Sequence, residues 1–229
     1  MAISRLERYQ KPDDLPTRIP LFPLRGALLL PRAHVPLNIF EPRFLAMVDD
    51  ALAGDRIIGL IQPRLVQDEV ESPAGKSVPL RATGGAGRIV AFQETDDGRY
   101  QITLVGVCRF SLAREVQIDK PYRLGDVRFA DFRADLIRGF GEEQVDRGHL
   151  LEVLKAYLDN QNLKADWTAI TRSSSEFLVN SLSMMSPYGP EEKQALLEAP
   201  DLKTRAEVLV ALAKMQLATP GDGSGSAMQ

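Results

Sequence analysis

Short apolar segments interrupted by proline make up the chain from residue 19 to residue 44. The prolines that divide these segments are Pro20, Pro23, Pro31, Pro36 and Pro42. Because proline disrupts helix interiors and central strands of a sheet, the pattern predicts short strands joined by turns and bulges. Residues 44–52 instead carry apolar side chains at helical spacing, and Gly54 follows as a stop signal. We therefore expect one short helix within a β-rich region.

Alternating apolar and polar positions predict several further strands. Residues 56–61 form a compact apolar segment, and residues 88–92 and 100–107 flank the dipeptide Asp97-Gly98, which is typical of a hairpin turn. Another strand is expected over residues 122–132. Several short strands with turn signals in about 120 residues favour a small barrel or sandwich.

After Gly141 the apolar period changes from two residues to that of a helix. One helical stripe runs through residues 150–158 and a second through residues 167–185. A third helix is expected to start at Pro190, because proline suits the first helical turn. Asp201 is a suitable N-cap for a fourth helix. The pattern therefore predicts a small four-helix bundle.

The change of period near residue 140 divides the chain into two folded parts. We expect a flexible extension over residues 1–16, a β domain over residues 17–138, a helical bundle over residues 139–219 and a disordered tail over residues 220–229. The predicted fold class is α+β, with a β-barrel-like domain that carries one short helix, followed by the four-helix bundle.

Composition adds exclusions rather than an activity. The chain has 229 residues, 44% of them hydrophobic, and 28 basic against 31 acidic residues give a net charge of −3. These values are typical of a soluble globular protein and rule out a disordered chain or a disulfide scaffold. No apolar run approaches the ~20 residues of a membrane span. The N-terminus also lacks the apolar centre of a signal peptide. We expect a cytoplasmic protein that binds no membrane.

Few residues are candidates for catalysis or metal binding. Cys108 and His34 could form a nucleophile pair, but Cys108 lies in an apolar strand segment and is more typical of a buried core cysteine. His149 and Glu152 share a helix face, where an ion pair is favoured over a metal site because further ligands are missing. We therefore expect no enzyme activity, no cofactor and no metal.

Arginines recur at five-residue steps in one segment and could form a strip that binds nucleic acid. They are Arg123, Arg128, Arg133 and Arg138. Three aspartates alternate with them, namely Asp126, Asp131 and Asp135. Since these carboxylates neutralise the strip and the whole chain is weakly acidic, a solvated face is the favoured interpretation, and nucleic acid is disfavoured as a partner.

Three segments near the N-terminus match a known family in order. Residues 20–24 read Pro-Leu-Phe-Pro-Leu, Leu30-Pro31 follows, and residues 36–43 read Pro-Leu-Asn-Ile-Phe-Glu-Pro-Arg. This series resembles the opening of the Lon protease N-terminal domain, also called the Lon substrate-binding domain. The family's Gly-x-x-Arg-Phe element is matched by Gly106, Arg109 and Phe110.

The resemblance covers roughly residues 17–218 and carries expectations for the fold. Members of this family have a small β-barrel related to the PUA class, followed by a helical bundle. The chain ends before the ATPase and protease modules of full-length Lon would begin, so it resembles the freestanding bacterial form of the domain. Proteolytic activity is not implied.

The resemblance also implies a non-catalytic role in binding unfolded or tagged polypeptides, as an adaptor or chaperone-like factor. A protease or a chaperone is a further candidate partner, and a homo-oligomer is left open. The alternative is an RNA-binding module of the PUA type.

Four residues are candidate polypeptide contacts: Phe40, Arg43, Phe44 and Arg109. The first three lie at a proline-bounded bend, where the two aromatic rings could instead fill the barrel core and Arg43 could pair with Glu41 to fix the bend. Arg109 could likewise anchor a loop or face a groove.

Overall fold

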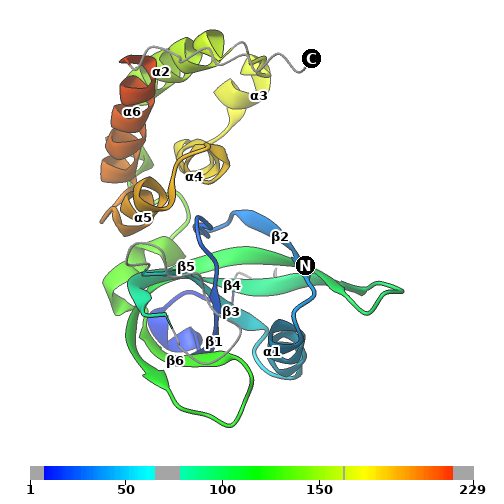
Figure 1. Cartoon of the computed structure of the whole chain (residues 1–229). Helices are drawn as coiled ribbons and strands as arrows, with labels where there is room; N and C mark the ends of the chain where they lie inside the picture. Colours follow the sequence, from blue (N-terminus) through cyan, green and yellow to red (C-terminus); the bar gives the residue numbers. More distant parts are fainter. Residues whose placement is uncertain (1–7, 65–77, 162, 219–229) are drawn as a thin grey trace, which may run out of the picture.

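The computed structural model describes residues 8–64, 78–161 and 163–218. It contains a β-rich part and a helical part that pack against each other (Figure 1). The strands are β1 (Arg18–Pro23), β2 (His34–Ile39), β3 (Ile57–Pro63), β4 (Leu80–Glu94), β5 (Tyr100–Val116) and β6 (Arg123–Arg128). The α-helices are α1 (Pro42–Ala53), α2 (Arg147–Asn160), α3 (Trp167–Arg172), α4 (Ser175–Met185), α5 (Pro190–Glu198) and α6 (Leu202–Ala218). The α+β class predicted from the sequence is confirmed.

The six strands form one sheet that closes into a ring. Their order is β2-β5-β4-β3-β1-β6, and β6 pairs again with β5. The long β5 makes this closure possible because it pairs with β4 along one edge and with two strands along the other. On that second edge, residues 100–105 pair with β2 and residues 111–116 pair with β6. As a result, among the strands that the structure describes, β2 has β5 as its one neighbour and forms an edge strand.

The core of the barrel is apolar, as the alternation along β5 predicts. Ile102 and Leu104 are 2% and 0% exposed and point into the core cluster that α1 also covers. The predicted short helix is confirmed as α1, which begins at Pro42 and contributes Met47 and Val48 to this cluster. Helix α1 therefore covers one side of the ring. The N–H of Gly54 donates to carbonyl oxygens in the last turn of α1, where the helix ends.

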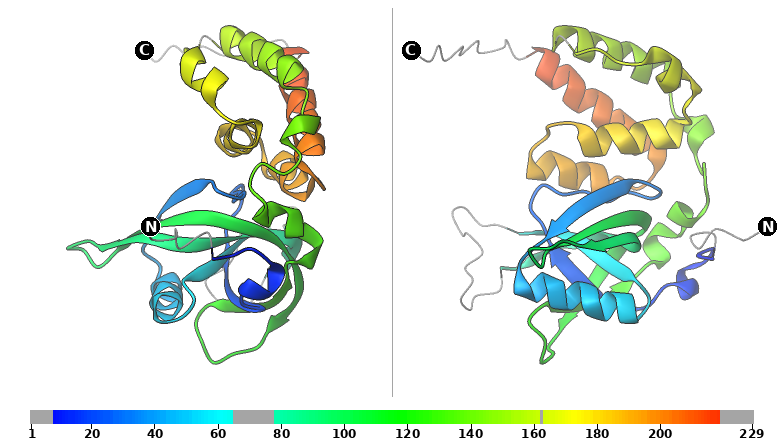
Figure 2. Two further views of the ribbon diagram at one scale, coloured as in Figure 1. Left: turned by 180° about the vertical axis from the view of Figure 1, so that it is seen from behind. Right: turned by 90° about the vertical axis from the view of Figure 1, so that its right-hand side faces the viewer.

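The helical region contains five α-helices within the described residues, one more than predicted. The stripe expected over residues 167–185 is divided into α3 and α4, because the Ser174 side chain accepts a hydrogen bond from the N–H of Phe177 and starts a new helix. The start of α5 at Pro190 and the cap of α6 by Asp201 are as predicted. The helices α4 and α5 lie next to the barrel, whereas α3 and most of α2 lie farther from it (Figures 1 and 2).

Two segments of the β-rich part differ from the prediction. The strand expected over residues 122–132 ends at Arg128, and a 3-10 segment, η2 (Ala130–Leu136), follows. The extension expected over residues 1–16 is packed where the structure describes it, since Tyr9 and Leu15 are each 4% exposed. A short 3-10 turn, η1 (Pro12–Asp14), lies between them. Residues 1–7 of that extension and the tail predicted over 220–229 lie outside the described residues.

The segment Leu28–Leu30 connects the two parts of the molecule. Leu29 belongs to the core cluster of the barrel, whereas Leu28 and Leu30 belong to the core cluster of the helices. The backbone of this segment passes so close to the sheet that a Cβ on Gly85 would lie 2.0 Å from the Leu29 carbonyl oxygen, and a Cβ on Gly106 would lie 2.0 Å from that of Leu30. Glycine is required at both positions, because any side chain would displace the segment.

Candidate functional site

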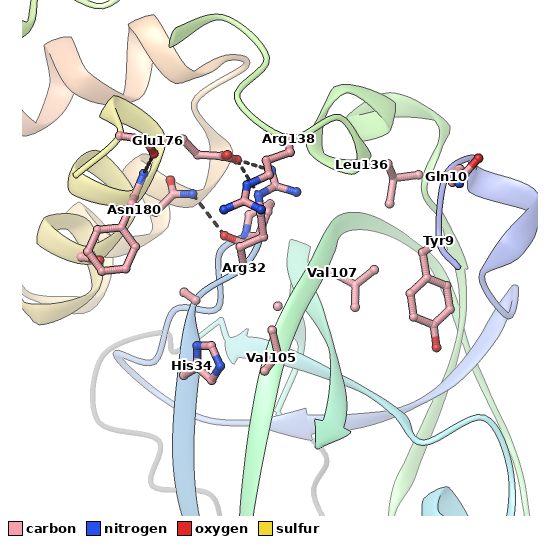
Figure 3. A pocket seen from close by; sticks show the side chains of 16 residues that line it. Tyr9, Gln10, Arg32, His34, Val105, Val107, Leu136, Arg138, Glu176 and Asn180 are labelled. Atoms are coloured by element: carbon pink, nitrogen blue, oxygen red, sulfur yellow. Dashed lines mark hydrogen bonds and ion pairs between the residues drawn. The ribbon is translucent and has the colours of Figure 1, made fainter. Parts of the chain in front are cut away.

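The junction of the barrel and the helices, which we call the seam, contains a cleft of about 590 Å³. Its floor is formed by Val105, Gly106 and Val107 of β5, and its opposite wall by the first turns of α4 (Figure 3). The cleft lies where β2 and β6 leave a gap along the edge of β5, so the topology of the sheet creates it. A volume in this range is typical of ligand-binding pockets.

Charged and apolar side chains meet in this cleft. Arg32 donates from Nε to Glu176 Oε1 at 3.0 Å, so these two charges offset each other. Asn180 of α4 donates to the carbonyl oxygen of Pro31 at 3.3 Å and thereby ties α4 to the barrel. Phe177, on the first turn of α4, lines the cleft although its side chain is 62% exposed.

A second hollow of about 290 Å³, the helical groove, lies within the helical region. It is bounded by α2, α6 and the connection between α4 and α5, and most of its lining is apolar. Among the lining residues are Leu150, Leu154, Leu158, Leu182, Leu209 and Ala213. Two of the other lining side chains are strongly exposed, Met185 at 81% and Leu163 at 55%. The groove therefore presents apolar surface to solvent.

Three of the four predicted contact residues lie together at the end of β2. Phe40 is 62% exposed, whereas Phe44 is 5% exposed and packs against Phe22 with ring centroids 4.3 Å apart. Arg43 forms an ion pair with Glu41 at 2.8 Å. The guanidinium of Arg43 also lies 4.5 Å from the centre of the Phe44 ring. Of this group, Phe40 and Arg43 have side chains at the surface, and Phe44 belongs to the barrel core.

The fourth predicted contact residue, Arg109, belongs to the seam. Its side chain is 2% exposed and forms a two-point ion pair with Asp135, through Nε at 2.8 Å and Nη2 at 2.9 Å. From β5 it also donates to the carbonyl oxygens of Leu197 and Ala199 at the end of α5. Arg109 therefore connects the barrel to the helical region, and its side chain does not line the helical groove.

Further buried polar side chains complete the seam. Gln62 of β3 donates to Gln194 of α5 at 3.1 Å, and Gln194 donates to the carbonyl oxygen of Thr83 at 3.3 Å. Arg205 of α6 donates to Asn180 Oδ1 at 2.9 Å. Burial lowers the pKa of Arg205 to about 9, with a smaller contribution from the nearby positive charge of Arg109. These residues were not predicted from the sequence, although single polar positions inside apolar segments are the signal that could have indicated them.

The candidate nucleophile Cys108 is buried in the barrel. Its thiol is 1% exposed and donates to the Phe132 carbonyl oxygen at 3.4 Å. Burial raises the pKa of this thiol far above its usual range, so the reactive thiolate is disfavoured. Cys108 is therefore a core residue, the interpretation favoured from the sequence.

The pair of His149 and Glu152 lies at the surface of α2. His149 Nδ1 lies 3.7 Å from Glu152 Oε2, the pairing predicted for this helix face. Among the residues that the structure describes, no cluster of three or more His, Cys, Asp or Glu side chains could hold a metal ion. Within the same residues, no helix is both long and apolar enough to cross a membrane.

A comparison with protein-family models decides the family. Residues 18–214 match the model of the ATP-dependent protease La (LON) substrate-binding domain. The chain belongs to the LON substrate-binding domain family. The match includes both the barrel and the helical region. The helical groove lies within the matched residues, and the cleft does so apart from its lining residues Tyr9 and Gln10.

Relatives of this LON domain include full-length proteases. The chain is 27% identical over 208 residues to a Lon protease of Flavobacterium johnsoniae, and the alignment covers 87% of this chain and 24% of the relative. It is 28% identical over 206 residues to Lon protease 2 of Sorangium cellulosum, with 87% of this chain and 25% of the relative covered. The chain therefore spans about a quarter of the length of these relatives.

Solved structures share the fold of this LON domain. A Lon N-terminal domain protein from Xanthomonas campestris superposes with a TM-score of 0.60 at 23% identity, covering 85% of this chain and 97% of that one. The N-terminal domain of a Mycobacterium avium complex Lon protease superposes with a TM-score of 0.62 at 16% identity, covering 86% and 98%. The arrangement of a barrel followed by helices is thus shared with both structures.

Proposed function

We propose that this protein is a non-catalytic polypeptide-binding protein that takes up unfolded or tagged segments, as an adaptor or chaperone-like factor in protein quality control. Membership of the LON substrate-binding domain family supports this role. The candidate partners are unfolded chains, together with a protease or a chaperone to which they are delivered.

The observation that carries the proposal is the helical groove. A protein that binds many unfolded chains needs exposed apolar surface that adapts to different side chains. The groove offers this surface, because Met185 and Leu163 are 81% and 55% exposed at its rim above a floor of leucines. Methionine is well suited to such a surface, since its unbranched and polarizable side chain fits partners of different shape.

Strand addition to β2 is a weaker route to the same function. An extended polypeptide can pair with the free edge of a strand, and β2 has such an edge. Pro36 lies in the middle of β2 and lacks the N–H that a paired strand would need. Proline on an edge strand protects a sheet against unspecific pairing. We therefore assign polypeptide binding to the helical groove rather than to the β2 edge.

The bend after β2 supplies a second contact in this proposal. Phe40 is exposed beside the Arg43–Glu41 ion pair, so both an aromatic and a charged group are accessible there. The buried Phe44 and Arg109 hold this bend and the seam in place from within. Their predicted direct contact with polypeptide remains a prediction.

The first arginine of the strip gives the RNA-binding alternative no support. Arg123 is paired with Glu115 through two hydrogen bonds. The neighbouring Asp126 bonds to both Arg18 and Arg114. Charges neutralised in this way are poor contacts for a phosphate backbone.

Binding of fluorescein-labelled β-casein, followed by fluorescence anisotropy, tests the proposal. We expect saturable binding that weakens at least fivefold in the double variant Met185→Gln/Leu163→Gln, because two exposed apolar contacts are lost. Met215→Gln is the matched control, since Met215 is 66% exposed and does not line the groove. Absence of saturable casein binding by the folded wild-type protein would refute the proposed function.

A further inference from the structure

Among the described residues, the cleft in the seam carries one positive charge that the other lining residues do not offset. The charged members of that described lining are Arg32, Arg138 and Glu176. Arg32 and Glu176 form an ion pair, and Arg32 also donates to the carbonyl oxygen of Asp135 at 2.9 Å. Arg138 is exposed and forms no ion pair with any residue in the part of the chain that the structure describes. The cleft therefore presents a guanidinium that is available to an anion.

Apolar surface lies beside this charge. Figure 3 shows Arg138 close to the Arg32–Glu176 pair, above the floor formed by Val105 and Val107. Phe177 lines the same cleft with 62% of its side chain exposed. An exposed phenylalanine and an unoffset arginine in the same cleft favour a ligand that carries both a carboxylate and an apolar group.

We propose that this cleft binds the C-terminal residue of a polypeptide, with the terminal carboxylate on Arg138 and the last apolar side chain against Phe177. The inference rests on the proposed function, because it specifies which part of a bound polypeptide occupies the seam. A C-terminal residue carries both kinds of group that this cleft would bind, because its carboxylate and its side chain are attached to the same Cα. Arginine suits this ligand because its planar group can bind both carboxylate oxygens.

The size of the cleft agrees with a chain end. A volume of about 590 Å³ lies in the range of pockets that enclose small molecules. The walls come from the barrel, from α4 and from the segment between Leu136 and Arg138. The rest of the polypeptide is then free to reach other apolar surface such as the helical groove.

A pair of peptides separates the terminal carboxylate from other contributions. The probe is fluorescein-Gly-Ser-Ala-Ala-Leu-Val with a free C-terminus, and its twin has the same sequence with a C-terminal amide. We expect the amide to bind about tenfold more weakly to the wild-type protein, which corresponds to about 1.4 kcal/mol. We expect Arg138→Gln to weaken the free peptide by a similar factor and to leave the amide unchanged.

Matched variants distinguish the cleft from the general surface. Arg133→Gln removes an exposed arginine outside the cleft, and Phe140→Ser removes a phenylalanine that is 54% exposed and also outside it. Both should leave the free peptide binding as the wild type does, whereas Phe177→Ser should weaken both peptides. Circular dichroism spectra and melting curves of all four variants establish that they are folded.

The outcomes separate this inference from the proposed function. Equal binding of acid and amide, or no effect of Arg138→Gln, would overturn the cleft assignment even when casein binds. If an amidated peptide with an internal aspartate bound as tightly as the peptide with a free C-terminus, this would also overturn the assignment, because the cleft would then bind any carboxylate. Loss of casein binding in the groove variant, with the acid–amide difference intact, would support two separate contact sites.

Discussion

The barrel core and the seam are held together by different physical means. In the barrel, residues such as Leu104 and Ile58 are fully buried among other apolar side chains, and close packing provides the stability. In the seam, Arg109, Gln194 and Arg205 are equally buried but act through directed hydrogen bonds to carbonyl and carboxylate oxygens.

This difference between apolar packing and directed hydrogen bonds explains how the position of the cleft is fixed. Apolar packing tolerates small rearrangements when the volume is kept, whereas a buried two-point ion pair has a single favourable geometry. The Arg109–Asp135 pair and the bonds from Arg109 to the end of α5 therefore set how the helices sit on the barrel. Since the cleft wall belongs to α4 and its floor to β5, the seam also sets the cleft's width.

The largest effect is expected for Arg109→Ala. This change leaves the Asp135 carboxylate buried without its partner, and we expect the free energy of unfolding to fall by about 4 kcal/mol. Guanidinium chloride unfolding followed by circular dichroism measures the loss. Arg114→Ala is the control, because its ion pair with Asp126 is exposed and should contribute less than about 1 kcal/mol. Similar losses in the two variants would contradict a structural role for the buried pair.

A somewhat smaller effect is expected in the barrel core. Leu104 is 0% exposed, and Leu104→Ala should lower the free energy of unfolding by about 3 kcal/mol through lost burial and a residual cavity. Peptide binding by the folded variant should remain at the wild-type level, since Leu104 does not reach the seam. The exposed Val90→Ala provides the reference for a substitution outside the core. A changed peptide affinity in Leu104→Ala would show that packing in the barrel core also influences the cleft.

The smallest effect on the free energy of unfolding is expected at the contact between the barrel and α1. Tyr122 donates to Asp50 Oδ2 of α1 at 2.6 Å, and burial together with this carboxylate raises the pKa of Tyr122 to about 12. We expect Tyr122→Phe to lose about 1 kcal/mol near pH 8. Because the folded-state pKa lies above the unfolded value of about 10, the contribution is complete below pH 10 and disappears as the pH rises through about 12.

Urea unfolding of both proteins at pH 8 and at pH 11.5 measures this contribution. The difference between wild type and Tyr122→Phe should shrink at the higher pH. A difference that stays constant over this range would mean that the phenol proton is not part of the contact.

The sequence predicted those elements whose signals are local. The hairpin around Asp97-Gly98, the helix after Pro42 and the start of α5 at Pro190 all depend on neighbouring residues, and all are present. The division between α3 and α4 was not predicted. Apolar residues continue at helical spacing on both sides of Ser174, because both helices face the same core, so periodicity alone could not reveal the break.

The site was harder to predict because it joins distant segments. The cleft brings together β5, α4 and the segment from Leu136 to Arg138, and no local pattern marks that arrangement. Phe177 and Leu178 belong to one apolar stripe in the sequence, yet they are 62% and 5% exposed. Adjacent helix positions point about 100° apart, so only the packing of α4 decides which of them is buried. Arg109 was predicted as a polypeptide contact, and its burial could not be foreseen because it depends on carbonyl groups 88 and 90 residues away.

The segment Leu28–Leu30 has a consequence for cooperativity. Neighbouring leucines of this segment complete two different cores, so neither core can lose it and remain intact. A helical fragment cut off at residue 138 would lack two of its core side chains, and a barrel fragment would expose them to water. We therefore expect the barrel and the helices to unfold as one unit. A ligand bound in the seam would consequently stabilise the whole barrel, including strands far from the ligand, as much as the helices that contact the ligand.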